Sequence, residues 1–280
     1  MICPKCGAPV DYHRTVCERG HFIGFPNVRR AEAMRAELEQ NYSAAVTQAT
    51  VRGVMVQVRQ LEILLQGTVA TINVDAKILR NMAVGQNYLS YYKALDLGLR
   101  KIAEERYHAH RGAVDEKIHP GFRAEIVNAA LSPDGRGLIN YGVITLEFQN
   151  VSIEDRASVM RENSFAFYER NDLGRRDAVE ELGWRSVWAD RAHLGVAHLA
   201  PTVTPATAIH ELADHILFSG ATRPDDRYIE VHIFGEISWQ SLSKVTLEKP
   251  LTKPEDQDDW SFGQQKLKTR GVMIVDRVNP

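Results

Sequence analysis

The sequence predicts an α+β fold in which a helical segment comes first and a strand-rich segment follows. Between residues 29 and 66 there is no proline, and apolar residues repeat at helical spacing. From about residue 107, strand-like runs outnumber helical patches and do not alternate regularly with them. Connectors such as SPDGRG and KPEDQDD separate these runs. This order of elements favours a split mixed sheet over a doubly wound parallel sheet.

The composition is that of a soluble globular protein. The 280 residues are 44% hydrophobic and 25% charged, and the net charge of −2 gives no global attraction to nucleic acid or to membranes. No apolar run reaches membrane-spanning length, and the first residues do not read as a signal peptide. The three cysteines lie within the first 17 residues, which is not a secreted disulfide framework. We expect a cytoplasmic protein with no membrane partner.

Residues 1–27 predict a zinc ribbon. Cys3 and Cys6 form a CxxC pair, and Cys17 and His21 form a CxxxH pair. Two short-spaced pairs supply the four ligands of a closed tetrahedral zinc site, which is structural because no position remains for a substrate. His13 is a weaker substitute for the fourth ligand. The alternative is three reduced thiols without a metal, which would be exposed to oxidation.

A ribbon of this kind often binds a macromolecule. Four arginines give this one a local basic bias, namely Arg14, Arg19, Arg29 and Arg30. The bias favours a nucleic acid or a protein as partner.

Residues 28–106 predict a helical connector. Val51, Val54, Val58, Leu61 and Leu65 step by 3, 4, 3 and 4, which is one stripe of a helix. The segment is one long helix or a helical hairpin broken near Gly53. Its stripe packs on the main domain or makes a coiled-coil or other helical contact with a partner chain. We favour packing, because threonine and valine are mediocre helix formers for an isolated rod.

Two further helices and a strand complete the connector. The run TVATINV predicts a short strand, and Asp75 predicts the N-cap of a helix that ends near Gly85. The run NYLSYYKALDLGLRKIAEERY (87–107) predicts another helix, with tyrosines on its packing side.

Residues 107–280 predict the main α+β domain. The expected strands are 141–148, 158–168, 185–199, 228–235, 243–249 and 271–277. The expected helical patches are 171–183, 205–218 and 262–269.

The segment HELADH invites a metallohydrolase interpretation. It resembles the HExxxH element of dipeptidyl-peptidase III, and would use His210, Glu211 and His215. Histidines at i and i+5 lie roughly 140° apart around a helix, so they share a metal only if the helix bulges. The apolar residues of the segment already explain a packed helix. The zinc hydrolase is therefore the weaker alternative.

The strand that follows carries more chemical information. In RYIEVHIFG, Ile229, Val231 and Ile233 alternate with Glu230 and His232. A glutamate and a histidine in mid-strand, opposite an apolar face, indicate the wall of a cleft. An edge strand with its polar side in water is the alternative.

The order of elements in residues 107–278 resembles the mono-ADP-ribosyltransferase-like domains. The resemblance rests on the helix AIHEL, the strand YIEVHIFG, the strand KVTLEK, a polar helix and the final strand GVMIVD. It implies an ADP-ribosyltransferase-type sheet, NAD as co-substrate, and Glu230 as the catalytic residue. SPDGRGLINYGVITLEF resembles the family's serine-bearing region, which implies that Ser132 and Tyr141 lie near the nicotinamide pocket.

The same resemblance implies the remaining cofactor contacts. The segment IEDRASVMRENSF offers Arg156, Ser158, Asn163 and Ser164. The family's early arginine or histidine corresponds to His110 or Arg111, in a helical context. Glu230 would stabilise the oxocarbenium-like state formed when the nicotinamide–ribose bond breaks. Tyr141 would stack on nicotinamide, and an arginine would hold a phosphate.

The sequence thus leads to one preferred function and two alternatives. The preferred function is NAD-dependent transfer of ADP-ribose to a macromolecular acceptor, protein or nucleic acid, as in a toxin or defence effector. The alternatives are a non-catalytic zinc-ribbon adaptor that binds nucleic acid or protein, and the zinc hydrolase based on HELADH.

Overall fold

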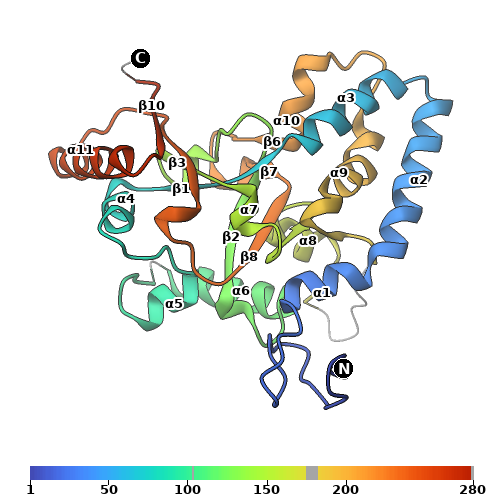
Figure 1. Ribbon diagram of the computed structural model, residues 1–280. Helices are drawn as coiled ribbons and strands as arrows, with labels where there is room; N and C mark the ends of the chain where they lie inside the picture. The colour runs from blue at the N-terminus through green and yellow to red at the C-terminus, as the bar shows by residue number, and fades with distance from the viewer. Residues whose placement is uncertain (103, 175–181, 279–280) are drawn as a thin grey trace.

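A large mixed sheet forms the body of the protein (Figure 1). The structure is a computed structural model that describes residues 1–102, 104–174 and 182–278. In these ranges the sheet has the strand order β10-β9-β3-β1-β2-β8-β4-β5, and β9 and β10 are its parallel pair. Its strands are β1 (Val69–Val74), β2 (Ile126–Ser132), β3 (Ile144–Phe148), β4 (Ala157–Met160), β5 (Arg185–Val187), β8 (Glu230–Phe234), β9 (Leu242–Leu247) and β10 (Met273–Asp276). A small antiparallel pair is formed by β6 (Leu217–Phe218) and β7 (Arg227–Tyr228).

Helices surround this sheet. They are α1 (Pro26–Ala33), α2 (Arg35–Val51), α3 (Met55–Gln66), α4 (Ala76–Ala83), α5 (Tyr91–Asp96), α6 (Glu105–Ile118), α7 (Asn150–Ile153), α8 (Ser164–Arg170), α9 (Arg191–Leu199), α10 (Leu212–Ile216) and α11 (Pro254–Thr269). Short 3-10 helices include η2 (Ile139–Tyr141) and η5 (Ile209–Glu211).

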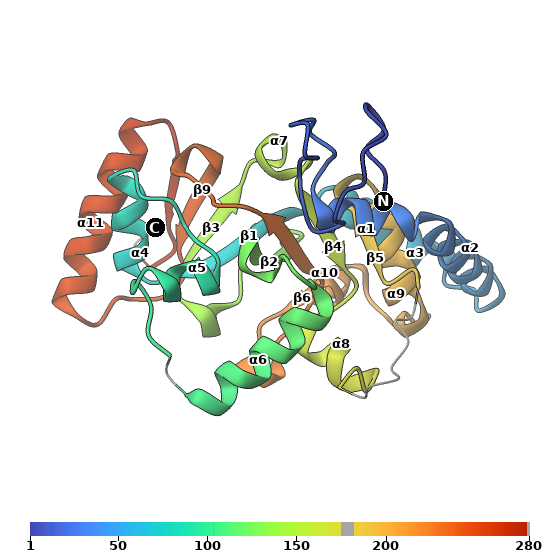
Figure 2. The same ribbon diagram turned by 90° about the horizontal axis from the view of Figure 1, so that it is seen from below.

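One face of the sheet is apolar and carries the main core. Strand register aligns Ile72 with Leu146, Leu146 with Val245, and Val231 with Val159. These side chains form one buried cluster with residues of α2, α3, α4, α9 and α11. In Figures 1 and 2, α4 and α11 lie together at one end of the molecule, and α2, α3 and α9 lie at the other. Burial of this face is the main driving force for the fold.

The opposite face of the sheet is polar. Register aligns Glu230 with Ala130 of β2 and Met160 of β4, and Met160 with Arg185 of β5. Two residues further along β8, His232 aligns with Ser158. Helices α6 and α8 lie side by side in Figure 2, and their residues form a second small core with Met160. Polar side chains on a covered sheet face are costly unless they are paired, so this face is where chemistry is to be sought.

Several local predictions are confirmed. The helical connector breaks at Gly53, which has φ +71° between α2 and α3. Four residues of its apolar stripe pack in the main core, namely Val54, Val58, Leu61 and Leu65, whereas Val51 is exposed. Asp75 is the N-cap of α4, and its side chain accepts a hydrogen bond from the amide of Ile78. All four strand segments predicted at 141–148, 228–235, 243–249 and 271–277 contain strands, and α11 covers the predicted helix at 262–269.

Other element predictions are wrong in part. Residues 87–107 do not form one helix: the short helix α5, which Ser90 caps, ends at a turn around Gly98 with φ +67°, and helix α6 starts at Glu105. The strand predicted at 158–168 stops at Met160, because Asn163 caps helix α8. The strand predicted at 185–199 stops at Val187, and α9 follows.

The remaining element predictions concern residues 171–183 and 205–218. The predicted helix at 171–183 falls mostly outside the described residues. The helix predicted at 205–218 is shorter, with η5 and α10 followed by strand β6.

Strand β1 lies in the middle of the sheet, between β2 and β3. It comes from residues 28–106, which the sequence assigns to a connector. The sheet therefore takes strands from both sides of the boundary predicted at residue 106. In the described ranges, no helix combines the length and the apolar character needed to cross a membrane.

Candidate active site and metal cluster

Four N-terminal side chains converge as the sequence predicts. The ligand atoms of Cys3, Cys6, Cys17 and His21 all lie within 4.8 Å of one another, close enough to bind one metal ion. The Sγ atoms of Cys6 and Cys17 are 3.8 Å apart, and Nδ1 of His21 lies 3.6 Å from Sγ of Cys17. Ligands at about 2.3 Å from a tetrahedral zinc ion are about 3.8 Å apart, so the cluster fits this geometry.

Two tight turns bring these ligands together. Gly7 and Gly20 have φ of +70° and +77°, which glycine adopts without strain. The amide of Gly7 donates to the carbonyl of Cys3, and the amide of Gly20 donates to that of Cys17. His13, the substitute ligand, is not part of the cluster, and its ring packs against Gly121.

The HELADH segment does not form a metal site. In the described part of the chain, the N-terminal four residues are the only cluster of three or more cysteine, histidine or acidic side chains close enough to share an ion. Glu211 accepts a hydrogen bond from the amide of Ala208, and Nδ1 of His215 lies 3.1 Å from the hydroxyl of Thr202. The alternative of a zinc hydrolase therefore lacks its ligand set.

Glu230 begins strand β8 and is the buried carboxylate of the polar face. It is 3% exposed. Its Oε2 accepts hydrogen bonds from the backbone amide of Ser164, at 2.7 Å, and from the Ser164 hydroxyl. Nε2 of His232 lies 3.3 Å from the same oxygen. All three contacts use Oε2, and none of them uses Oε1.

The surroundings of Glu230 favour its ionised form. Burial raises the pKa of this carboxyl, but the hydrogen bond from His232 and the donors of Ser164 outweigh burial and hold the pKa below its usual value. Burial lowers the pKa of His232 itself, so its ring acts on Glu230 mainly as a hydrogen-bond donor. Helix α8 begins at Ser164, so its N-terminal amide adds to the stabilisation. Glu230 is thus a buried carboxylate that carries charge at neutral pH.

Helix α6 presents Arg111 and Asp115 to the same region. Nε of Arg111 donates to Asp115 at 3.2 Å, one turn along the helix, and the Tyr92 hydroxyl donates to the same carboxylate oxygen at 2.8 Å. The guanidinium also lies over the ring of Tyr91, with 4.5 Å to the ring centroid. Burial by itself would lower the pKa of Arg111. The negative charges of Asp115 and Glu230 outweigh burial and raise the pKa above its usual value, so Arg111 stays charged. The carboxylate of Asp115 and the ring of Tyr91 thereby hold the fork of Arg111 in one orientation.

Two tyrosines and an asparagine complete the cluster. Asn163 caps α8 and donates from Nδ2 to the Tyr228 hydroxyl. Tyr228 and Tyr141 influence each other's pKa, and Glu230 acts electrostatically on both phenols. Tyr141 ends η2 and is 37% exposed, with Arg223 stacked 4.8 Å from its ring centroid. We call Glu230, Arg111, Asn163, Tyr228 and Tyr141 the Glu230 cluster. This cluster reaches the surface of the protein at Tyr141.

The other three predicted cofactor residues do not reach this cluster with their side chains. Ser132 is fully buried at the end of β2, and its hydroxyl lies 3.4 Å from Asp134. Ser158 is buried beside His232, and its hydroxyl accepts from Asn27. Arg156 donates to backbone carbonyls, including that of Phe234 at 2.8 Å, at the far end of β8. The structure thus gathers Arg111, Tyr141, Asn163 and Glu230, and leaves these three in the framework.

Sequence reasoning missed several members of the cluster. Asp115 follows Arg111 by four residues, a helical pairing signal that was available once residues 105–118 were assigned to a helix. Tyr92 and Tyr228 reach the site through tertiary contacts that no local pattern marks. The strand pattern predicts that His232 lies on the same side of its strand as Glu230. In the structure the His232 ring contacts the Glu230 carboxylate.

Behind His232 lies a second buried histidine. The His119 ring meets that of His232 edge to face, with centroids 4.3 Å apart. Burial, and then the nearby His232 and Arg185, hold the pKa of His119 well below its usual value, so it is neutral. His119 follows Ile118, whose carbonyl accepts from Arg30 and Arg185.

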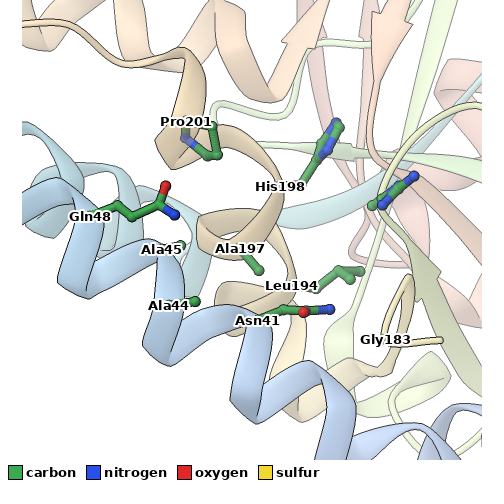
Figure 3. Close-up of a pocket in the computed structure, with 10 residues that line it drawn as sticks. Asn41, Ala44, Ala45, Gln48, Gly183, Leu194, Ala197, His198 and Pro201 are labelled. Carbon is green, nitrogen blue, oxygen red and sulfur yellow. The ribbon is translucent and has the colours of Figure 1, made fainter. Parts of the chain in front are cut away.

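A cavity of about 260 Å³ lies elsewhere, between α2 and α9 (Figure 3). Asn41 and Gln48 of α2 face His198 and Leu194 of α9 across it. Burial, and then Arg161 and Arg170, lower the pKa of His198 to about 4, so its ring is neutral. None of the Glu230 cluster lines this cavity. The residues that line this cavity include no carboxylate, so we assign chemistry to Glu230.

Comparison with known proteins gives no matching family model and no matching curated sequence. The function must therefore be argued from the site itself.

Proposed function

We propose that the protein cleaves the nicotinamide–ribose bond of NAD and transfers ADP-ribose to a macromolecular acceptor. The observation that carries this proposal is the ionised, buried carboxylate of Glu230, next to the fixed cation Arg111 and the half-exposed ring of Tyr141. A carboxylate, a cation and an aromatic ring match the three parts of NAD that the reaction must hold. These are the ribose, a phosphate and the nicotinamide ring.

The chemistry requires stabilisation of positive charge. As the bond to nicotinamide breaks, positive charge develops on the ribose ring, as in glycoside hydrolysis. A preorganised carboxylate in a water-poor site stabilises this charge without reorganisation at the moment of reaction. Glu230 meets this condition, because Ser164 and His232 hold one oxygen while the other is left for the ribose.

The other residues take binding roles in the proposal. Arg111 bonds Asp115 through Nε, which leaves its two terminal amino groups to grip a phosphate bidentately. Tyr141 stacks on the nicotinamide ring from the exposed side of the cluster. Asn163 holds Tyr228 in place below it.

The N-terminal cluster has a separate role in the proposal. It binds structural zinc, because three thiolates and an imidazole at tetrahedral spacing leave no open position for a substrate. The folded ribbon then serves to dock the acceptor, a protein or a nucleic acid. The ribbon carries exposed apolar side chains suited to such contact, among them Ile2 and Phe22.

The proposal is tested by incubating the protein with NAD labelled in the adenylate moiety, with and without a cell lysate. We expect nicotinamide release and transfer of label to lysate macromolecules. Glu230→Gln keeps the side-chain shape and removes the charge, and we expect it to lower the rate by about 10²-fold or more.

A matched control tests whether activity depends on the charge of Glu230 itself or on the loss of any glutamate charge. Glu236 follows the other end of β8 and is 41% exposed, so Glu236→Gln should retain activity. Circular dichroism of both variants establishes that they are folded. Absence of nicotinamide release and of label transfer from the wild type under all conditions would refute the proposal. The zinc-ribbon adaptor would then be the better account.

A further inference from the structure

Ser164 makes the most direct contact with Glu230 in the described part of the chain. Its backbone N–H and its hydroxyl both donate to Oε2, and the hydroxyl also lies 3.3 Å from Nε2 of His232. The side chain is 2% exposed and stands at the first position of helix α8, which Asn163 caps through the amides of Phe165 and Ala166. Helix α8 and its cap therefore hold Ser164 in position independently of its contact with the carboxylate.

From this geometry we infer that Ser164 is the positioning residue for Glu230, which it keeps ionised with Oε1 turned toward the substrate. The inference rests on the proposed function, since it assigns Glu230 the catalytic role. A carboxylate that is buried without donors would become protonated or rotate toward another partner. Two donors from one residue to one oxygen fix both the charge and the rotation of the carboxylate.

The remaining groups around Glu230 do not replace Ser164. The titratable groups that act on Glu230 come from five other elements and are His232, Arg111, Asp115, Tyr141, Tyr228 and Arg185. Arg111 is engaged by Asp115, and the Tyr228 hydroxyl accepts a hydrogen bond from Asn163. His232 donates to the same oxygen as Ser164 and so cannot fix the rotation of the carboxylate alone.

Ser164→Ala removes the hydroxyl donor but keeps the backbone N–H and the helix. We expect the turnover number to fall roughly tenfold with little change in KM, because the loss concerns a hydrogen bond to a charged group at the reacting centre. The ionised form of Glu230 loses stabilisation, so its pKa rises. The acid limb of the rate profile should therefore move to higher pH by about one unit.

Two comparisons isolate the role of the hydroxyl. Ser164→Thr retains it and should restore both the turnover number and the pH profile. Ser186→Ala removes an equally buried hydroxyl that lies on the opposite face of the sheet, paired with Val159, and should change neither.

A readout that does not need activity accompanies the kinetics. The carboxyl carbon of Glu230, assigned in ¹³C-glutamate-labelled protein by comparison with Glu230→Gln, is titrated by NMR. A higher Glu230 pKa in Ser164→Ala, restored in Ser164→Thr, supports the inference. An unchanged pKa in Ser164→Ala overturns it, whatever the activity. If the pKa rises but the wild type does not turn over NAD, the contact stands as the means of fixing Glu230 and only the proposed function fails.

Discussion

The hydroxyl of Tyr12 donates a 2.7 Å hydrogen bond to the carbonyl of Pro120, which joins the N-terminal ribbon to the segment that carries His119. His119 contacts His232, and His232 contacts Glu230. The Tyr12 ring also meets Phe122 edge to face. The N-terminal ribbon and the buried carboxylate are therefore connected by one continuous set of contacts.

Removal of the metal should open the ribbon without unfolding the sheet. Cys17→Ser should reduce the metal content from about one zinc ion per chain to near zero, because a three-ligand structural site loses most of its affinity. Limited proteolysis should then cut within residues 1–25, while the sheet keeps its circular dichroism. His13→Asn, which alters a ribbon histidine outside the cluster, should keep the metal. Retention of full metal by Cys17→Ser would contradict the assignment.

The histidines of the HELADH segment should not affect metal content. His210 is exposed, and His215 is engaged with Thr202. The double variant His210→Ala with His215→Ala should bind as much zinc as the wild type, measured by atomic emission. A second zinc ion in the wild type that this variant loses would revive the hydrolase.

Ionisation of Glu230 should appear in the pH dependence of stability. Because its pKa is lowered on folding, its contribution is fully present above the ordinary glutamate pKa of 4.5 and is lost as the pH falls through the lowered value. The difference in free energy of unfolding between the wild type and Glu230→Gln should narrow below about pH 4. Urea denaturation at a series of pH values measures this. A difference that stays constant from pH 7 to pH 3 would mean that folding does not lower the pKa of Glu230.

Asp115 should be important for both stability and ligand affinity. Asp115→Asn leaves the charge of Arg111 without its carboxylate and should cost about 2 kcal/mol of unfolding free energy. The apparent affinity for NAD should fall as well, because the fork of Arg111 loses its orientation. Arg136→Gln, which breaks a surface pair with Asp134 between side chains 66% and 44% exposed, should change stability by less than about 1 kcal/mol. Equal effects of the two changes would contradict the role given to Asp115.

Gly142 should tolerate no side chain. A Cβ at this position would lie 2.5 Å from the carbonyl carbon of Val74, and backbone cannot yield as a side chain does. Gly142→Ala should therefore destabilise the protein by about 2 kcal/mol and displace the neighbouring Tyr141. Gly53→Ala meets open space and should cost only the penalty of its positive φ, about 1 kcal/mol. Thermal unfolding of the two variants compares the costs.

Local signals predicted much of the framework. The ribbon ligands were identifiable because their spacing alone brings them onto two turns. The break at Gly53 and the cap at Asp75 were predicted for similar reasons, since each depends on residues within one turn of the chain. Glu230 was singled out by the alternation of its strand, and the structure places it on the polar face.

The secondary-structure predictions failed where the same apolar residues fit both the two-residue period of a strand and the 3.6-residue period of a helix. In 185–199 the apolar residues suit a strand, but Ala192, Val196 and Leu199 also follow helical spacing, and packing of Gly195 against Leu65 stabilises the helix. In 158–168 the apolar residues suit a strand, but Asn163 is the N-cap of a helix and ends the strand. The link from Glu230 to Tyr92 and Tyr228 joins distant parts of the chain, so only the folded arrangement reveals it.

The central place of β1 has a consequence for any attempt to divide the protein. A fragment that starts at residue 107 would lack the strand that joins β2 to β3. Two half-sheets would then face each other with unpaired edges, which are templates for aggregation. During synthesis, β1 must likewise wait for two later strands before its hydrogen bonds are satisfied on both sides. We therefore expect the strand-rich part to be obtained in folded form only together with residues 69–74.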